Sequence, residues 1–273
     1  MPHMLIFGLG YSARFIAEGL RALGWSVEAT GSAGTIAFDD DAAVCAALAR
    51  ADAVLSSVPP AEGGDPVLAR YGDALGAPWL GYLSSTGVYG DTGGAWVDET
   101  APIGGGRRSA RAVADAAWLA RGARVFRLPG IYGPERSAFE RIAEGRAHRI
   151  DLSGQIFSRI HVEDIASGVI AALDAPAGAY NLADDLPAPQ NAVIEEACRL
   201  SGQPLPPLQT LDEAGLSPMA RAFYAENRRV ANGKAKRVLG WRPAYPTFRE
   251  GLSAISKPTP ASTEPPTASG VQR

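Results

Sequence analysis

The chain has 273 residues, of which 46% are hydrophobic and 20% charged, and its net charge is −3 at pH 7. The near balance of 26 basic and 29 acidic residues excludes a bulk electrostatic attraction for nucleic acid. A chain of this length buries a large core without help from disulfides or metals. Cys45 and Cys198 lie far apart and share no ligand spacing, so we expect neither a disulfide framework nor a metal site.

Neither a membrane span nor a leader peptide is predicted. No stretch reaches the roughly 18–20 apolar residues that a transmembrane helix needs. The apolar run at the N-terminus lacks the basic start of a signal peptide. We therefore expect a cytoplasmic protein with no membrane and no nucleic-acid partner.

Short apolar runs alternate with Ala-rich amphipathic runs in the first two thirds of the chain. Strands are expected at residues 4–7, 25–30, 35–38, 53–58, 79–84 and 123–128, and helices at 12–23, 41–50, 67–75 and 108–121. This alternation predicts an α/β fold, a doubly wound parallel sheet of the Rossmann type with helices on both faces.

The alternation loosens after Pro129. Helices are expected at residues 138–145, 165–173 and 191–200, a strand at 180–183 and a Pro-rich loop at 204–218. Residues 257–273 are rich in Pro, Ser and Thr without periodic apolar positions, which predicts a disordered tail.

A glycine loop follows the first predicted strand and opens the first predicted helix. Its sequence, Gly8-Leu9-Gly10-Tyr11-Ser12-Ala13, fits the dinucleotide-binding pattern G-x-G-x-x-A in the required strand–turn–helix context. Gly8 permits the tight turn, Gly10 allows close approach of a pyrophosphate, and Ala13 lets helix and strand pack closely. The N–H groups at the helix N-terminus suit the phosphates of NADP or NAD, and the alternative is an ordinary turn.

The end of the second predicted strand favours NADP mildly over NAD. An acidic residue there would bind the ribose 2′-hydroxyl of NAD, but the chain has Thr30-Gly31-Ser32, and Glu28 stands two residues too early. The hydroxyls of Thr30 and Ser32, with Arg14 as a further candidate, suit a 2′-phosphate. Asp39 or Asp40 would accept a hydrogen bond from the adenine amino group or cap the next helix.

Several motifs together resemble the extended short-chain dehydrogenase/reductase superfamily, of the NAD-dependent epimerase/dehydratase type. Besides the glycine loop, they are LSSTGVYG at 83–90, RLPGIYGP at 127–134, RIHVEDIA at 159–166, YNLA at 180–183 and KRVLGWRP at 236–243. The resemblance implies one domain over residues 1–256. It comprises a Rossmann core at about 1–165 plus 180–190 and a smaller C-terminal substrate lobe from the remaining segments. It also implies a small polar or nucleotide-sugar substrate and a homodimer.

The resemblance assigns roles to residues one by one. Ser85 matches the catalytic Ser/Thr whose hydroxyl binds the reacting oxygen; its alternative is a turn hydrogen bond. Pro129, Gly130 and Tyr132 match a loop beside the nicotinamide. Asp164 is expected to cap the following helix, and His161 is an acid–base candidate or a structural residue. Further cofactor contacts are expected from the residues Ser57, Val58, Pro59 and Ser84.

The catalytic Tyr-x-x-x-Lys pair of the resembling family is missing. Two alignments place either Gly106 and Ala110, or Arg107 and Arg111, at its positions. An arginine stays protonated at neutral pH, so it polarises an oxygen or holds a ribose without shuttling a proton. Arg111 has an alternative role as an ion-pair partner of Asp115 one helical turn later.

Substitutes for the missing acid–base pair stand elsewhere in the sequence. They are Tyr82, Tyr89, Tyr132 and His161, for which packing is the alternative. The segment 96–99 after the VYG motif is either a substrate loop or an exposed turn.

Two functions therefore remain open from the sequence. The first is an atypical NAD(P)-dependent oxidoreductase or epimerase, with Ser85, Tyr89, Tyr132 and Arg111 as catalytic candidates. The second is a non-catalytic NAD(P)-binding module that senses redox state.

Overall fold

The computed structural model describes residues 1–62, 64–106 and 109–257. Arg107, one of the candidates for the missing catalytic pair, lies outside the described residues. So does the predicted disordered tail apart from its first residue, Lys257.

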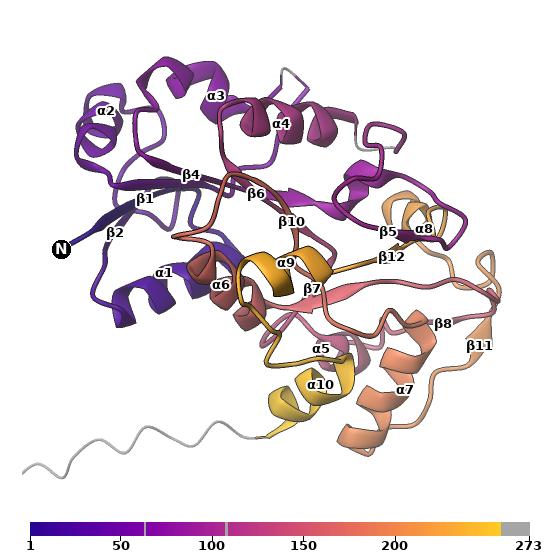
Figure 1. Ribbon diagram of the computed structural model, residues 1–273. Helices are drawn as coiled ribbons and strands as arrows, with labels where there is room; N and C mark the ends of the chain where they lie inside the picture. Colours follow the sequence, from indigo (N-terminus) through magenta and orange to yellow (C-terminus); the bar gives the residue numbers. More distant parts are fainter. Residues whose placement is uncertain (63, 107–108, 258–273) are drawn as a thin grey trace, which may run out of the picture.

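A six-stranded sheet forms the centre of the molecule (Figure 1). Its strands are β1 (His3–Phe7), β2 (Ser26–Ala29), β3 (Ala53–Ser56), β4 (Trp79–Ser85), β6 (Arg124–Leu128) and β10 (Gly178–Asn181). They stand in the order β2-β1-β3-β4-β6-β10, and every neighbouring pair is parallel. This topology confirms the predicted doubly wound α/β fold.

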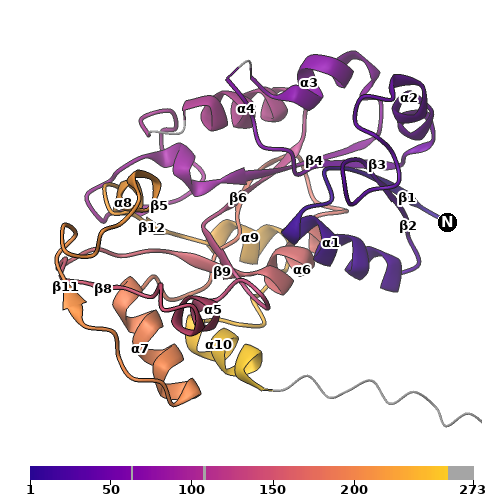
Figure 2. The same cartoon turned by 180° about the vertical axis from the view of Figure 1, so that it is seen from behind.

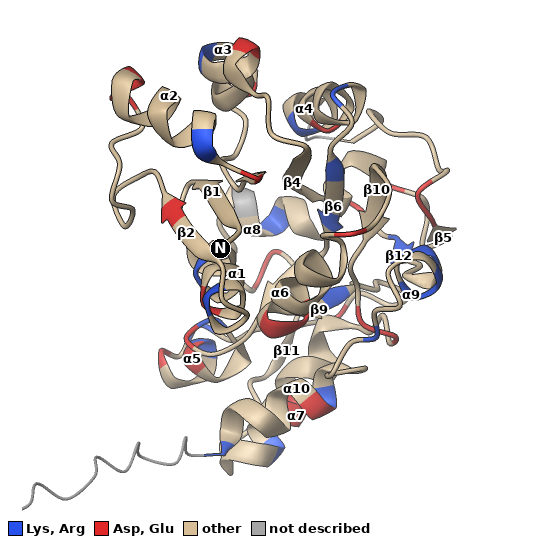
Figure 3. Cartoon of the chain, turned by 60° about the vertical axis from the view of Figure 1, so that its left-hand side comes forward, with Lys and Arg blue, Asp and Glu red and all other residues tan. Residues whose placement is uncertain are grey.

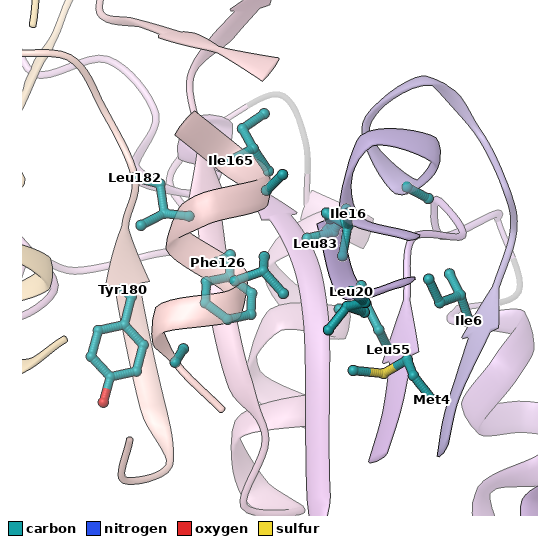
Figure 4. Packing of buried hydrophobic residues seen from close by; sticks show 14 of the residues in the cluster. Met4, Ile6, Ile16, Leu20, Leu55, Leu83, Phe126, Ile165, Tyr180 and Leu182 are labelled. Atoms are coloured by element: carbon teal, nitrogen blue, oxygen red, sulfur yellow. The ribbon is translucent and has the colours of Figure 1, made fainter. Parts of the chain in front are cut away.

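Helices cover both faces of the sheet because its strands are apolar on both sides. Met4 and Ile6 face α1 (Tyr11–Ala22) and α6 (Val162–Ala171), where the core in Figure 4 lies. Leu5 and Phe7 pack toward α2 (Asp41–Arg50), α3 (Pro66–Tyr71) and α4 (Ser109–Ala120). A 3-10 turn at Gly72–Ala74 ends the helix predicted at 67–75. This burial of alternate side chains on opposite faces is typical of parallel sheets.

A C-terminal lobe packs below the carboxyl ends of the strands (Figures 1 and 2). Three small parallel pairs belong to it: β5 (Trp96–Val97) with β12 (Arg229–Val230), β7 (Gly130–Tyr132) with β9 (Arg159–His161), and β8 (Arg149–Ile150) with β11 (Leu208–Gln209). Its helices are α5 (Ala138–Ala143), α7 (Gln190–Ser201), α8 (Pro218–Phe223) and α10 (Phe248–Ser256). Helix α9 (Gly233–Val238) instead packs beside β10 of the central sheet. Helices α5, α7 and α10 share an apolar core.

Three local predictions were wrong. Residues 35–38 form no strand, because only Ile36 bridges back to Thr30. The predicted loop 204–218 contains β11, and α8 begins at its last residue. Asp164 does not cap its own helix: His161 is the cap, through Nδ1, which accepts from the Glu163 N–H at 3.3 Å. The Asp164 carboxylate instead accepts from the backbone N–H groups of Ala244 and Tyr245, which fastens the C-terminal segment to α6.

Segment 96–99 is not a simple exposed turn. Trp96 and Val97 form β5, and the Glu99 carboxylate turns inward to accept from the Asn181 N–H at 2.7 Å.

Basic and acidic residues are interspersed over both lobes (Figure 3). Within the described ranges, no helix has the length and apolar character needed to cross a membrane.

Candidate functional site

The glycine loop presents an open helix N-terminus. Gly8 has φ +82°, its N–H donates to Thr30 Oγ1 at 3.2 Å, and its carbonyl accepts from Ser57 Oγ at 2.5 Å. Gly10 is the N-cap of α1, which has neither a side-chain cap nor an acidic residue in its first turn. Apart from Gly10 and its chain neighbours, no atom of the described residues lies within 4 Å of the point where a Gly10 Cβ would stand. The loop therefore offers a positive helix end with space for an anionic group.

The acidic and hydroxyl residues after β2 differ in whether they are free to meet a ligand. Thr30 is buried and holds Gly8, whereas Ser32 is exposed. Glu28 pairs with Arg50 and with His3, so its carboxylate is already engaged. Asp40 caps α2, which leaves Asp39 as an exposed side chain whose backbone carbonyl accepts from Arg70.

A single cavity of about 1130 Å³ joins the glycine loop to the C-terminal lobe. Most of the residues predicted for the site line it: Gly10, Tyr11, Ser12, Ala13, Ser57, Ser84, Ser85, Arg111, Pro129, Gly130 and Tyr132. The remaining predicted residues are not in its lining: Gly8, Thr30, Ser32, Asp39, Val58, Pro59 and Tyr89. The structure thus brings together residues from the ends of β1, β3, β4 and β6, where parallel sheets bind ligands.

Ser85 lines this cavity at the end of β4. It ends β4 and caps the 3-10 turn η2 (Thr86–Tyr89), where its Oγ accepts from the Gly87 N–H at 3.1 Å. An accepting hydroxyl keeps its own hydrogen, so Ser85 retains a donor for an oxygen in the cavity. The neighbouring Ser84 points the other way, and its Oγ donates to Asp115 at 2.6 Å.

Arg111 projects from α4 toward the same region. Its Nη1 donates to the Tyr82 hydroxyl at 2.8 Å and to the Leu83 carbonyl at 3.3 Å. The alternative that Arg111 pairs with Asp115 was wrong, because Asp115 is bound by Arg127. The guanidinium therefore lies at the cavity wall beside the end of β4.

A buried polar network explains where Tyr89 goes. Arg127 on β6 binds Asp115 on α4 through two nitrogens, at 3.1 and 2.8 Å, and donates to the Tyr89 hydroxyl at 3.0 Å. That hydroxyl donates in turn to Asn181 Oδ1 at 2.7 Å. Burial raises the pKa of Tyr89 to about 12 against the opposing effect of Arg127. These contacts favour a positioning role for Tyr89 over a catalytic one.

Tyr132 at the cavity wall packs edge-on against His161. Tyr132 lines the cavity, but its hydroxyl rests against α10 and contacts the Thr247 carbonyl at 3.5 Å. The His161 ring lies 5.2 Å from Tyr132 and 4.1 Å from Tyr245, measured between centroids. Burial lowers the pKa of His161 to about 4 and raises that of Tyr132, so both groups stay neutral near pH 7. This placement favours packing over acid–base chemistry for both.

The lobe end of the cavity holds residues that sequence reasoning missed. Arg141, Arg159, Gln190 and Tyr224 line it, together with Phe157. Arg159 belongs to the RIHVEDIA motif, yet only its histidine and Asp164 were singled out. The available signal was an arginine next to the apolar Ile160 on a short strand. The sequence alone does not tell a buried arginine from an exposed one, because most arginines are exposed.

Comparisons with known proteins support the fold independently. No protein-family model matches the chain. A structure of a functionally unknown conserved protein from Silicibacter pomeroyi is 41% identical, with a TM-score of 0.84, over 93% of this chain and 98% of that one. A human epimerase family protein, solved with NADPH, is 18% identical with a TM-score of 0.73, over 93% and 99% of the two chains.

Two further relatives are enzymes by name. The dTDP-glucose 4,6-dehydratase of Bacillus anthracis, solved with NAD, is 17% identical with a TM-score of 0.73 and covers 94% of this chain and 96% of its own. A 3-diazoavenalumate denitrifying reductase from Streptomyces is 29% identical over 140 residues, which are 47% of this chain. The matched segment spans 45% of that reductase, less than half its length.

The chain has the fold of the extended and atypical short-chain dehydrogenase/reductases, with NAD-dependent epimerases and dehydratases among its structural neighbours, as the sequence motifs predict. Within that class, it belongs to the same family as the Silicibacter pomeroyi protein.

Proposed function

We propose that the chain is an atypical NAD(P)-dependent oxidoreductase that reduces a small polar substrate, with NADPH as the preferred cofactor. The observation that carries the proposal is the single cavity that runs from the open N-terminus of α1 past Ser85 into the C-terminal lobe. A cofactor bound at one end would meet a substrate beside Ser85.

The residues present fit a dinucleotide. The α1 N-terminus at Gly10 to Ser12 would hold the pyrophosphate, and Pro129 with Gly130 would flank the nicotinamide end. Glu28, the acid on β2, forms an ion pair with Arg50 and contacts His3, which offsets its repulsion of a 2′-phosphate. When bound, the nicotinamide supplies or accepts a hydride. Structural neighbours solved with NADPH and with NAD support a nicotinamide cofactor of either kind.

The groups around Ser85 favour reduction over epimerisation. The Ser85 hydroxyl donates to the reacting carbonyl oxygen, and the Arg111 guanidinium adds positive charge at the same wall. Reduction leaves an alkoxide that takes its proton from water. Epimerisation begins with proton removal from a substrate hydroxyl, which needs a base. The family's Tyr and Lys positions hold neither residue, and Arg111 does not accept a proton at neutral pH.

Calorimetric titration of nucleotide-free protein with NADPH, NADH, NADP and NAD tests cofactor binding. Gly10→Asp places a carboxylate against the pyrophosphate and should abolish binding. Gly76→Asp is the matched control, because Gly76 is exposed, has equally open space at its Cβ position and lies outside the cavity lining. Equal affinity of the Gly10→Asp variant and the wild-type protein for NADPH would refute the assignment.

A carbonyl panel, followed by nicotinamide absorbance, tests the reaction. Ser85→Ala should lower turnover by about 10²-fold, as loss of an oxyanion donor does elsewhere, while NADPH affinity is unchanged. Ser256→Ala, on the exposed end of α10, is the control. Unchanged turnover in Ser85→Ala would remove Ser85 from the mechanism.

A non-catalytic redox sensor is the second candidate, and the missing Tyr and Lys favour it. Tight NADPH binding without consumption of NADPH by any member of the panel would support it.

Both cysteines are free, which agrees with our proposal of a reducing, cytoplasmic location.

A further inference from the structure

Arg159 is a buried charge at the lobe end of the cavity. It is 6% exposed on β9 and lines the cavity. Its Nη1 donates to the carbonyls of Phe157 and Ala188, both at 2.9 Å, and its Nη2 donates to Gln190 Oε1 at 3.0 Å. All three acceptors are neutral. They hold the guanidinium in one orientation without neutralising it.

The guanidinium has donors to spare. Of its five N–H groups, three are used, so Nε–H and one Nη2–H have no acceptor in the described part of the chain. No carboxylate of the described residues comes within 4.0 Å to form an ion pair with Arg159. Asp184 acts on it from beyond that distance: burial raises the pKa of Asp184, and the charge of Arg159 opposes that rise.

Arg159 is itself still charged at neutral pH. Burial lowers its pKa, and the value of about 10 lies well above 7. A buried charge without an ion pair is expensive, so a group that pairs with it is favoured. The cavity beside Arg159 is the place from which such a partner would come.

Other donors surround the same space. Tyr224 lines the cavity with its ring edge-on to Phe157, at 5.6 Å between centroids. Burial raises the pKa of Tyr224, while the charges of Arg141 and Arg159 both act to lower it. All three residues line the same cavity. Arg141 is exposed and has no ion-pair partner among the described residues. Helix α7, which begins at Gln190, has no side-chain cap and no acidic residue in its first turn, and adds partial positive charge.

We propose that Arg159, Arg141, Tyr224 and Gln190 form a subsite for a carboxylate on the substrate. This inference rests on the proposed function and names its substrate class: a carboxylic acid with an apolar body, whose reducible group reaches Ser85. The free N–H groups of a single fixed guanidinium suit one planar carboxylate. The flanking Phe157, Val193 and Ile194 are apolar, which suits a hydrocarbon body better than a sugar.

Binding of matched acids and amides tests the subsite. The probes are benzoate, cinnamate and hexanoate, each with its primary amide, titrated calorimetrically into the full-length protein with and without NADPH. At least one acid should bind about tenfold or more tightly than its amide. Arg141→Gln should weaken that acid by about tenfold while leaving the amide and NADPH unaffected. Arg199→Gln, which removes a charge from α7 outside the cavity, should change nothing.

Two variants separate binding from folding. Arg159→Gln should remove the preference for the acid over its amide. Because this variant also loses hydrogen bonds to Phe157 and Ala188, its binding data are interpreted only if its melting temperature is near that of the wild type. Tyr224→Phe deletes one hydroxyl, so a threefold or greater weakening of the acid alone supports the subsite even where Arg159→Gln fails to fold.

The outcomes distinguish the two proposals. NADPH binding without any preference for an acid overturns the carboxylate subsite and leaves the proposed function standing. Acid binding that depends on Arg141, without NADPH binding, supports the subsite and overturns the proposed function. UDP is titrated in parallel, and UDP binding tighter than every acid and dependent on Arg141 overturns the carboxylate assignment in favour of a nucleoside diphosphate.

Discussion

Loss of the Asp115 charge should destabilise the protein strongly. Asp115 and Arg127 have side chains 0% and 3% exposed, and the carboxylate takes two hydrogen bonds from the guanidinium and one from Ser84. Asp115→Asn keeps the shape of the side chain but leaves Arg127 buried without a counter-charge. Removing one partner of such a pair costs about 3–5 kcal/mol. Total stabilities of about 5–15 kcal/mol make this a large fraction.

Thermal and urea unfolding measure the effect. For a chain of this size, each kcal/mol shifts the melting temperature by about 2–4 °C, so Asp115→Asn should melt about 6–20 °C lower than the wild type. The control is Glu144→Gln, which breaks an exposed pair with Arg146 and should cost no more than about 1 kcal/mol. The double variant Asp115→Asn, Arg127→Met should recover part of the loss, because the orphaned charge is gone.

A small effect would refute the reasoning. If Asp115→Asn lowers the free energy of unfolding by less than about 1 kcal/mol, as loss of an exposed pair does, then the Asp115–Arg127 ion pair does not stabilise the packing of α4 on β4 and β6.

Two further predictions concern the packing around Tyr132 and His161. His161 has a folded pKa of about 4 against about 6.5 unfolded, so it contributes stability above pH 6.5 that is lost as the pH falls toward 4, because only the unfolded state takes up the proton. The variant His161→Asn can still cap α6. The difference in free energy of unfolding between the wild type and this variant should therefore fall by about 2 kcal/mol from pH 7 to 4.5. A difference independent of pH would contradict the burial argument. Gly251→Ala would place a Cβ 2.1 Å from the Tyr132 hydroxyl, so it should cost about 1–3 kcal/mol in urea unfolding by displacing that ring. The same change at Gly105, whose Cβ position is open, is the control, and equal stabilities of the two variants would show that Tyr132 moves freely.

The sequence by itself determined the sheet and the glycine loop. Strand–helix alternation is local, since each apolar run and each amphipathic run carries its own periodicity. The glycine loop is equally local, because Gly8 makes the tight turn with φ +82° and Gly10 leaves space for a phosphate at the helix end. The position of Ser85 at the end of β4 followed from the same alternation and from the motif around it.

Only the tertiary structure decided how polar side chains are partnered. Asp115 has Arg111 one turn away on its own helix, yet its partner is Arg127 on a neighbouring strand, because β6 runs beneath α4. The place of Tyr89 in the VYG motif predicts a catalytic role, but its hydroxyl donates a hydrogen bond to Asn181, 92 residues further along the chain. Arg159 gained its significance from burial beside a cavity built by distant segments. Short-range patterns fix secondary structure. Burial and ion pairing depend instead on contacts between residues that lie far apart in the sequence, and a local pattern does not show which of them meet.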